Sequence, residues 1–163
     1  MSLKDKLLKR KEQVDDASQK LEARVQAWFR ALTALIYFIE NTLSESIEAK
    51  LLSKQKTFKR SEDGRDLELP MLTLSANSIA VTSIAVTIEP VGVIPGDGRV
   101  DIKSGVIVGK GYALLWDGAG QVAPENWKIV ATNEQGKPDQ IKATPLTVDA
   151  LESALSEHLG LEE

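Results

Sequence analysis

The sequence predicts an α+β protein: a long N-terminal helix or broken helix pair, an antiparallel β-meander of five to six strands, and a C-terminal helix. Good helix formers dominate residues 3 to about 57, and neither proline nor glycine occurs before Gly64. From Leu67 the apolar residues recur with a period of two, which is typical of strands with one buried face. Short connections between the strands favour antiparallel pairing, because a parallel pair needs a crossover of about a dozen residues.

The first helix carries the spacing of a coiled-coil seam. Its apolar residues alternate in steps of four and three positions, which keeps them on one face. Upstream, Lys11 and Ser18 occupy the intervening core positions, and we expect weaker packing there. We interpret the regular part as the seam of an oligomer, formed by Leu21, Val25, Trp28, Leu32, Leu35 and Ile39.

Residues 27–39 are apolar around nearly the whole circumference of this helix. A helix of this kind is buried on all sides. One sheet covers one side, so we expect a helix of a second chain on the other. Burial between the sheet and loops of the same chain is the alternative.

The length of the helical segment requires either a break or a partner. A continuous helix over residues 3–57 would extend about 80 Å, whereas a compact monomer of this size has a radius of gyration of about 15 Å. Thr42 and Glu45, which follow Asn41, match a capping-box pattern. If the chain breaks here, we expect a second helix from about 43 to 57.

Period-two patterns and turn residues divide the rest of the chain into strands. Pro70 places the first strand at a sheet edge or a bulge, because proline has no N–H to donate. The final helix is predicted at 147–159, with Thr147 as its N-cap, Leu146 and Leu151 as a hydrophobic staple, and Gly160 as its C-cap. The strands are predicted at 67–74, 79–88, 99–108, 112–116 and 127–132, with a loop at 90–98, a turn at 133–136 and a short edge strand at 140–144.

These segments form one compact unit with two parts. Residues 1–60 are the long helical segment and the expected oligomerisation element. Residues 61–163 hold the antiparallel sheet and the C-terminal helix. A chain of 163 residues has the length of one domain and can bury a core without disulfides or a metal.

The composition excludes several kinds of chemistry. The chain has no cysteine, which excludes disulfides, thiolate metal sites and cysteine nucleophiles. His158 is the only histidine, so a histidine-rich metal site within one chain is excluded too. Three residues separate Gly105 from Gly109, where a phosphate-binding loop has four, and Gly111 follows Lys110 where that loop has a hydroxyl residue. We therefore expect no metal and no cofactor.

The net charge of −4 is unevenly distributed. Residues 1–60 carry 13 Lys and Arg against 8 Asp and Glu, whereas residues 61–163 carry 7 against 16. Such asymmetry can mark a contact with nucleic acid or an anionic membrane. Because acidic residues interrupt the first basic cluster, we favour solvated helix faces, or a basic arm that meets an acidic body, over nucleic-acid binding. The two clusters are Lys4, Lys6, Lys9, Arg10 and Lys11, and Lys50, Lys54, Lys56, Lys59 and Arg60.

The most apolar stretch, residues 27–39, is shorter than the span of about 20 residues that a transmembrane helix needs. The start of the chain lacks the apolar core of a secretory signal. We therefore expect a cytoplasmic protein without a transmembrane span, in which residues 1–3 are native or an expression leader.

Two groups of side chains are candidates for a ligand site. Tyr112, Trp116 and Trp127 are an aromatic concentration outside the long helix, and on one face of the sheet they would floor a small-molecule pocket. Packing under the terminal helices is the alternative. Asp97 and Asp101 are two carboxylates suited to acid–base work or to a hard cation, although Asp97 followed by glycine also suits a turn.

His158 is a candidate general base. Its place near the end of the last helix equally suits a boundary residue that the helix dipole favours. The sequence contains no serine-nucleophile signature of the G-x-S-x-G type.

These observations favour a non-enzymatic, self-associating protein-interaction module. In it the long helix forms a homo-oligomer and the acidic sheet body faces a partner protein. The alternative is a small-molecule-binding protein or enzyme with a pocket near Tyr112, Trp116 and Trp127.

Overall fold

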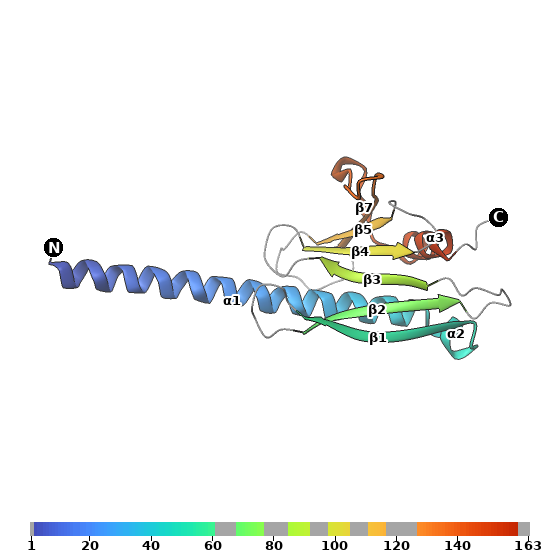
Figure 1. The fold of residues 1–163 in the computed structure, drawn as a ribbon, viewed down its shortest axis with the longest axis horizontal. Helices are drawn as coiled ribbons and strands as arrows, with labels where there is room; N and C mark the ends of the chain where they lie inside the picture. The colour runs from blue at the N-terminus through green and yellow to red at the C-terminus, as the bar shows by residue number, and fades with distance from the viewer. Residues whose placement is uncertain are drawn as a thin grey trace.

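Seven antiparallel strands in sequential order, β1 to β7, form one sheet (Figure 1). The structure is a computed structural model that describes residues 2–60, 68–76, 85–91, 98–104, 111–116 and 127–159. The α+β fold with a long first helix, a meander and a C-terminal helix is confirmed, with seven strands where five to six were predicted. The elements are α1 (Leu3–Thr42), α2 (Ser44–Glu48), β1 (Leu52–Arg60), β2 (Glu68–Ala76), β3 (Ala85–Val91), β4 (Gly98–Ser104), β5 (Tyr112–Trp116), β6 (Trp127–Ala131), η2 (Gln140–Lys142), β7 (Thr144–Pro145) and α3 (Val148–His158).

The helical prediction for residues 52–57 is wrong, because β1 begins at Leu52. Helix α2 ends at Glu48, and the chain leaves it through a left-handed residue, Lys50, whose φ is 61°. The N–H of Leu51 donates to the carbonyl of Ser46 and the N–H of Lys50 to that of Ile47, both at 3.0 Å. These two bonds make a Schellman motif, in which glycine normally occupies the left-handed position. The sheet therefore starts before the expected boundary at residue 60, and β1 pairs with β2 along its whole length.

The predicted break in the long helix is present, but not for the predicted reason. Helix α1 ends at Thr42 and α2 begins at Ser44. The N-cap of α2 is Leu43, which offers no side-chain acceptor, and the Thr42 hydroxyl donates to the carbonyl of Phe38 at 2.8 Å. The capping box predicted for Thr42 and Glu45 is therefore wrong.

A capping box that we did not predict starts α1. The N–H of Asp5 donates to Oγ of Ser2, and the N–H of Ser2 donates to a carboxylate oxygen of Asp5, both at 3.2 Å. Ser2 belongs to the three residues that we considered as a leader. In the structure it satisfies backbone groups at the start of α1.

Strand β2 covers the first predicted strand, but it is not an edge strand, because it pairs with both β1 and β3. Its ladder with β3 runs from Leu72 opposite Ile88 to Ser75 opposite Ala85. The next inward-facing pair in this register would be Pro70 with Pro90. Neither proline has an N–H to donate, which explains why the ladder ends there.

Several other predictions are settled only in part. Strands β3, β4, β5 and β6 match the cores of the predicted strands, while 79–84 and 105–108 lie outside the described residues. Pro90 and Val91 belong to β3 and Gly98 to β4, so the predicted loop is shorter at both ends. The predicted edge strand at 140–144 is wrong for residues 140–142, which form the 3₁₀ turn η2. Two-residue β7 then completes the sheet.

Helix α3 matches its prediction closely. The hydroxyl oxygen of Thr147 accepts from the N–H of Ala150 at 3.1 Å and caps the helix as expected. The C-cap is Leu159, one residue before the predicted one, and Gly160 lies outside the described residues.

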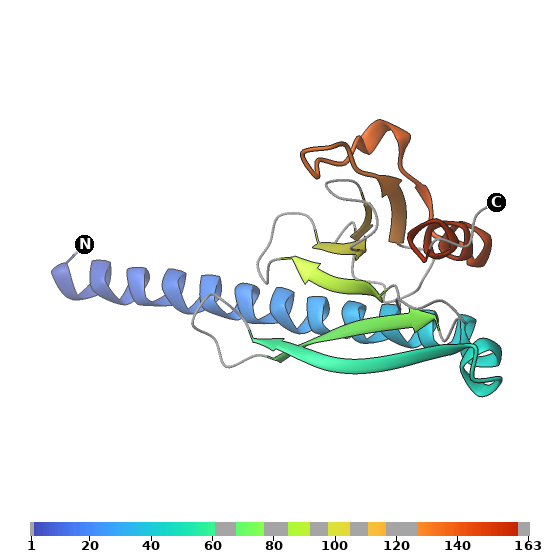
Figure 2. The ribbon, with the colours of Figure 1, turned by 45° about the vertical axis from the view of Figure 1, so that its right-hand side comes forward.

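Helices α1 and α3 contribute to one hydrophobic core with a single face of the sheet. Figures 1 and 2 show the second half of α1 running alongside the strands, and α3 lying near the end of the sheet farther from the start of α1. The core residues lie at helical spacing on the helices and at alternate positions on the strands, while Asp101, Ala113 and Val130 are also buried on the opposite face of the sheet. Central members of the core are Leu32, Leu35, Ile39, Leu72, Leu74, Ile88, Ile102, Leu114 and Leu151.

The first half of α1 projects beyond the sheet (Figures 1 and 2). We call residues 3–24 the arm. Every side chain from residue 3 to residue 20 is exposed, and burial begins at Val25. At 1.5 Å per residue the arm is about 33 Å long.

Candidate functional site

Three tryptophans from three elements meet in the core. The ring centroids of Trp28 on α1 lie 5.7 Å from Trp116 on β5 and 5.8 Å from Trp127 on β6. Trp116 and Trp127 are opposite each other in the sheet register, with centroids 6.4 Å apart. These distances suit aromatic packing. The tryptophan cluster therefore joins the start of the buried half of α1 to the sheet.

The three aromatic residues of the predicted pocket lie in two different environments, the tryptophan cluster and the contact with α3. Trp116 and Trp127 are 7% and 1% exposed, because Trp28 packs on both. Tyr112 lies on the same sheet face, since it shares alternation with Trp116, but its contacts are with α3. The indole N–H of Trp116 is buried without a hydrogen-bond partner among the described residues.

Asp101 lies on the opposite face of β4 from Val100 and Ile102, and Asp97 is outside the described residues. Arg99 Nε is 2.6 Å from Oδ1 of Asp101, and Lys103 Nζ is 3.7 Å from its Oδ2. The guanidinium of Arg99 also donates to the carbonyl of Gly136 at 2.6 Å. As expected from alternation, Arg99 and Asp101 share a face. Their contacts tether the 133–136 turn to the sheet.

The sheet register adds a carboxylate that sequence reasoning missed, because Glu89 on β3 lies opposite Asp101. No signal in the sequence specifies that pairing, since it depends on the register between two strands. Among the described residues, no group of three or more His, Cys, Asp or Glu side chains is placed to hold a metal ion.

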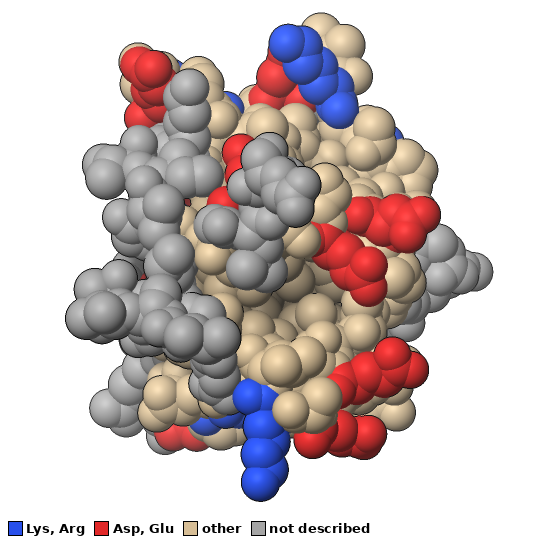
Figure 3. Space-filling view, turned by 90° about the vertical axis from the view of Figure 1, so that its right-hand side faces the viewer, with Lys and Arg blue, Asp and Glu red and all other residues tan. Residues whose placement is uncertain are grey.

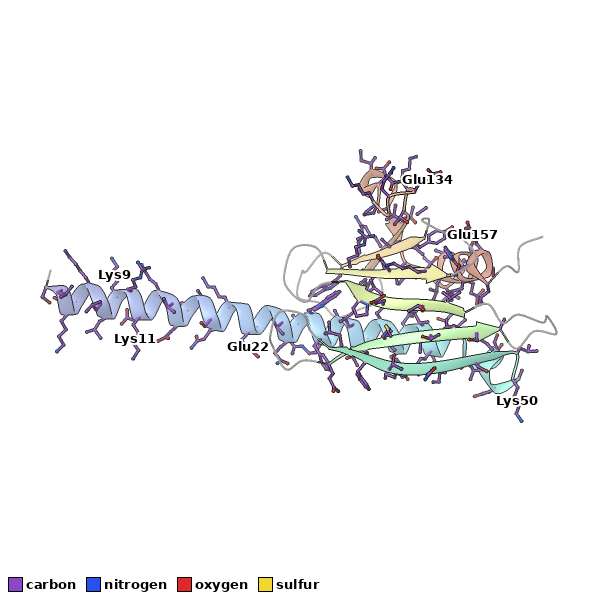
Figure 4. All side chains as sticks on the ribbon, in the orientation of Figure 1. Lys9, Lys11, Glu22, Lys50, Glu134 and Glu157 are labelled. Atoms are coloured by element: carbon purple, nitrogen blue, oxygen red, sulfur yellow. The ribbon has the colours of Figure 1, made fainter. Side chains whose placement is uncertain are left out.

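The buried His158 is the centre of a partly buried polar cluster between α3 and the sheet. Its Nδ1 lies 2.9 Å from Oγ of Ser104 on β4. Its ring makes an edge contact with the ring of Tyr112 on β5, with centroids 5.5 Å apart. The hydroxyl of Tyr112 donates to a carboxylate oxygen of Glu157, which neighbours His158 on α3 and is labelled in Figure 4. Sequence reasoning identified His158 but neither Ser104 nor the Tyr112–Glu157 bond.

Burial lowers the pKa of His158 below its ordinary value, and the negative charge of Glu157 partly opposes this shift. A serine next to an imidazole is the pairing from which nucleophiles are built. Here His158 is 1% exposed and its ring packs from α3 against Tyr112 of β5, so a substrate does not reach it in this conformation. The expectation of a boundary residue is wrong for the same reason. The cluster instead fixes α3 on the sheet.

The described side chains of the predicted seam lie on the sheet-facing side of α1. Val25, Trp28, Leu32, Leu35 and Ile39 are all buried, and the last four belong to the core that α1 shares with the sheet. Contacts that we expected between two chains are thus made within one chain. The side chain of Leu21 is outside the described set. On the outer side of this helix, Tyr37 is 72% exposed.

The two predicted basic clusters lie far apart. Lys54 and Lys56 project from β1, where Lys54 Nζ lies 2.5 Å and Lys56 Nζ 3.8 Å from the carboxylate of Glu40 on α1. The first cluster lies on the arm, where Figure 4 labels Lys9 and Lys11. At the opposite end of the molecule, most of the charged side chains visible in Figure 3 are acidic, and several of them lie beside a hollow lined by uncharged residues.

Comparisons with protein-family models, curated proteins and solved structures found no match for this chain. Within the described residues, no helix has both the length and the apolar character needed to cross a membrane.

Proposed function

We propose that this protein is a non-enzymatic, self-associating interaction module and that the arm is its association element. The observation that carries the proposal is an exposed apolar stripe on the arm. Leu3, Leu7 and Val14 are 73%, 60% and 56% exposed, and Ala17 is exposed as well. Large exposed apolar side chains that recur on one helix face favour a contact with another surface.

The stripe continues the buried face of the same helix. At 100° per residue, Leu3, Leu7, Val14 and Ala17 fall within about 80° of the helix circumference. Val25, Trp28, Leu32, Leu35 and Ile39 fall within the same sector by the same arithmetic. The sheet covers this sector from Val25 onward. One face, apolar except for Arg10, therefore runs along α1, and the arm presents the part of it that the sheet does not cover.

The energetics of an isolated helix support the same proposal. A helix without tertiary contacts is marginal in water, because most helical stability in proteins comes from packing of an apolar face. Burying one Leu or Val side chain stabilises by about 1.5–3 kcal/mol. Pairing of two arms would bury one stripe from each copy, and this burial of apolar side chains would favour self-association.

The proposal moves the association element upstream of the predicted seam. Residues 25–39 already have the sheet as their partner, whereas residues 3–17 do not. The alternative function, a small-molecule pocket floored by Tyr112, Trp116 and Trp127, gains no support from the packing. Trp28 occupies the space above both tryptophans, and Tyr112 belongs to the His158 cluster.

The test is the solution mass of the full-length chain by light scattering. We expect a dimer or larger assembly, and we expect the double variant Leu7→Glu, Val14→Glu to be monomeric. Leu8→Glu is the matched control, because Leu8 is 50% exposed on the same arm but lies outside the stripe. A monomeric wild-type chain, or a double variant that stays assembled, would contradict the proposal.

A further inference from the structure

We infer that two copies of this chain join through their arms as an antiparallel pair that crosses near residue 12. This inference rests on the proposed self-association and adds the identity of the partner surface and its orientation. It follows from three features of the arm: the extent of its uncovered stripe, the charge along its length, and one arginine within the stripe.

The extent of the stripe sets where the arms cross. By helical phase this face of α1 runs through positions 3, 7, 10, 14, 17 and 21, and burial against the sheet begins at Val25. In an isologous pair the same patch on each chain faces its copy across a two-fold axis. An antiparallel overlap of residues 3–21 with residues 3–21 has its midpoint at residue 12. Each arm then covers the other as far as the segment before Val25, where packing against the sheet begins.

The charge of the arm changes sign near this midpoint. Residues 4–11 contain five basic side chains and one acidic one, a net charge of +4. Residues 12–16 contain Glu12, Asp15 and Asp16 and no basic side chain, a net charge of −3. All of these side chains are exposed. Crossing at residue 12 brings residues 8–12 of one arm beside residues 12–16 of the other, so the basic end faces the acidic segment.

A parallel pair in register would bring like charges together. The basic segment would face the basic segment, and the acidic segment would face the acidic one. Such juxtaposition opposes association. Within residues 8–16 the charge pattern is therefore self-complementary in the antiparallel orientation alone, while Lys4 would lie opposite Lys20.

Arg10 also distinguishes the antiparallel pair from the parallel one, because its helical phase places it within the apolar stripe. In a parallel pair the two Arg10 side chains would meet in the seam. In the antiparallel pair Arg10 lies beside Val14 of the other copy, one residue from that copy's Asp15. The guanidinium then extends its apolar stem over the stripe and reaches a carboxylate, as long basic side chains do.

An anionic membrane surface is the competing partner, because the first eleven residues are basic and carry Leu3 and Leu7 on one face. The acidic segment at residues 12–16 argues against a membrane, since it would be repelled by anionic headgroups. In the antiparallel pair the same segment is required. The observations therefore favour a second copy of this chain.

Label distances distinguish the two orientations. The chain has no cysteine, so a single introduced cysteine carries the only spin label in each copy. In the full-length protein, Lys4→Cys labels in an antiparallel pair crossing at residue 12 are 16 residues apart along the axis, about 24 Å. In a parallel pair they are within about 15 Å, adjacent across a helix pair. Gln13→Cys is the control, because its labels are close in both orientations.

The salt dependence of assembly provides a second, independent measurement. Screening weakens attraction between opposite charges and also weakens repulsion between like charges. We expect the dissociation constant of the antiparallel pair to rise by about threefold or more between about 0.05 M and about 0.5 M salt. A parallel pair would instead become tighter over this range.

Each outcome has a distinct meaning. A dimer lost in Leu7→Glu, Val14→Glu, with long Lys4→Cys distances and weakening by salt, supports the inference. A dimer lost in the same variant but with short Lys4→Cys distances overturns the antiparallel orientation and leaves the proposed function intact. A monomer that binds vesicles of anionic phospholipid, but not vesicles of neutral phospholipid, overturns both.

Discussion

Gly98 on β4 lies directly against the indole ring of Trp28 on α1. A Cβ at position 98 would stand 2.5 Å from Cζ3 of Trp28 and 2.9 Å from Cε3 of Trp116. Both rings are held in the tryptophan cluster and have little room to move. Position 98 therefore requires glycine because of close packing, and this packing sets how near α1 approaches the sheet.

Gly98→Ala is expected to destabilise the protein by about 1–3 kcal/mol, the usual cost of adding a methyl group to a filled core. The measurement is urea unfolding followed by tryptophan fluorescence. The double variant Gly98→Ala, Trp28→Leu tests the cause, because a smaller side chain at 28 removes the clash. Its loss of stability should be smaller than the sum of the two single losses, and simple additivity would contradict the stated cause.

The lowered pKa of His158 predicts a pH dependence of stability. The unfolded chain binds a proton near pH 6.5, while the buried imidazole does so only at lower pH. Between these two values the unfolded state holds more protons, so the free energy of unfolding rises with pH. We expect the contribution of His158 to the free energy of unfolding to be fully present above pH 6.5. It should decline as the pH falls from 6.5 toward the lower pKa of the folded state.

Unfolding of wild type and His158→Gln over a series of pH values measures this effect. Since His158 is the only histidine, the difference between the two curves isolates its titration from that of the carboxylates. The difference should change below pH 6.5 and be flat above it. A difference curve that is flat throughout would show that burial of His158 has no linkage to folding.

Tyr112→Phe removes the hydroxyl that donates to the carboxylate of Glu157. A hydrogen bond to a charged group in a partly buried site contributes about 1.5–3 kcal/mol, so we expect a loss at or below the lower end of this range. The chain supplies a matched control in its other tyrosine. Tyr37 is 72% exposed, and Tyr37→Phe should leave the free energy of unfolding unchanged.

Lys50→Gly is expected to stabilise the protein by about 0.5–1 kcal/mol, because a non-glycine residue in the left-handed region costs about 1–2 kcal/mol and the added freedom of glycine in the unfolded chain offsets part of this. Thermal unfolding measures the change. Ala49→Gly is the control, since the φ of Ala49 is −76° and its glycine variant should be slightly destabilised. Equal effects at both positions would refute the role of φ at Lys50.

The periodicity of the sequence was enough to predict the α+β fold, the meander and the C-terminal helix, because one-sided burial imposes a period of two on strands and near 3.6 on helices. It failed at residues 52–57, where Leu, Lys and Gln favour a helix and the turn before them lacks glycine. There, pairing with β2 overrides local propensity.

The candidate sites were harder to predict for a related reason. Alternation correctly placed Arg99 with Asp101, and Trp116 with Tyr112 on one face. The sequence contains no information about which helix covers that face at each point. The contact of Trp28 with both tryptophans, and that of Ser104 with His158, depend on how α1 and α3 lie across the sheet.

Helix α1 is a single uninterrupted helix of 40 residues, of which one end forms the arm and the other end packs in the core. A partner that binds the arm therefore binds the same helix that packs against the sheet. Under the proposed pairing, occupancy of the arm and integrity of the core are linked by mass action, so the melting temperature should rise with protein concentration. Dilution alone would therefore lower the stability of the folded protein.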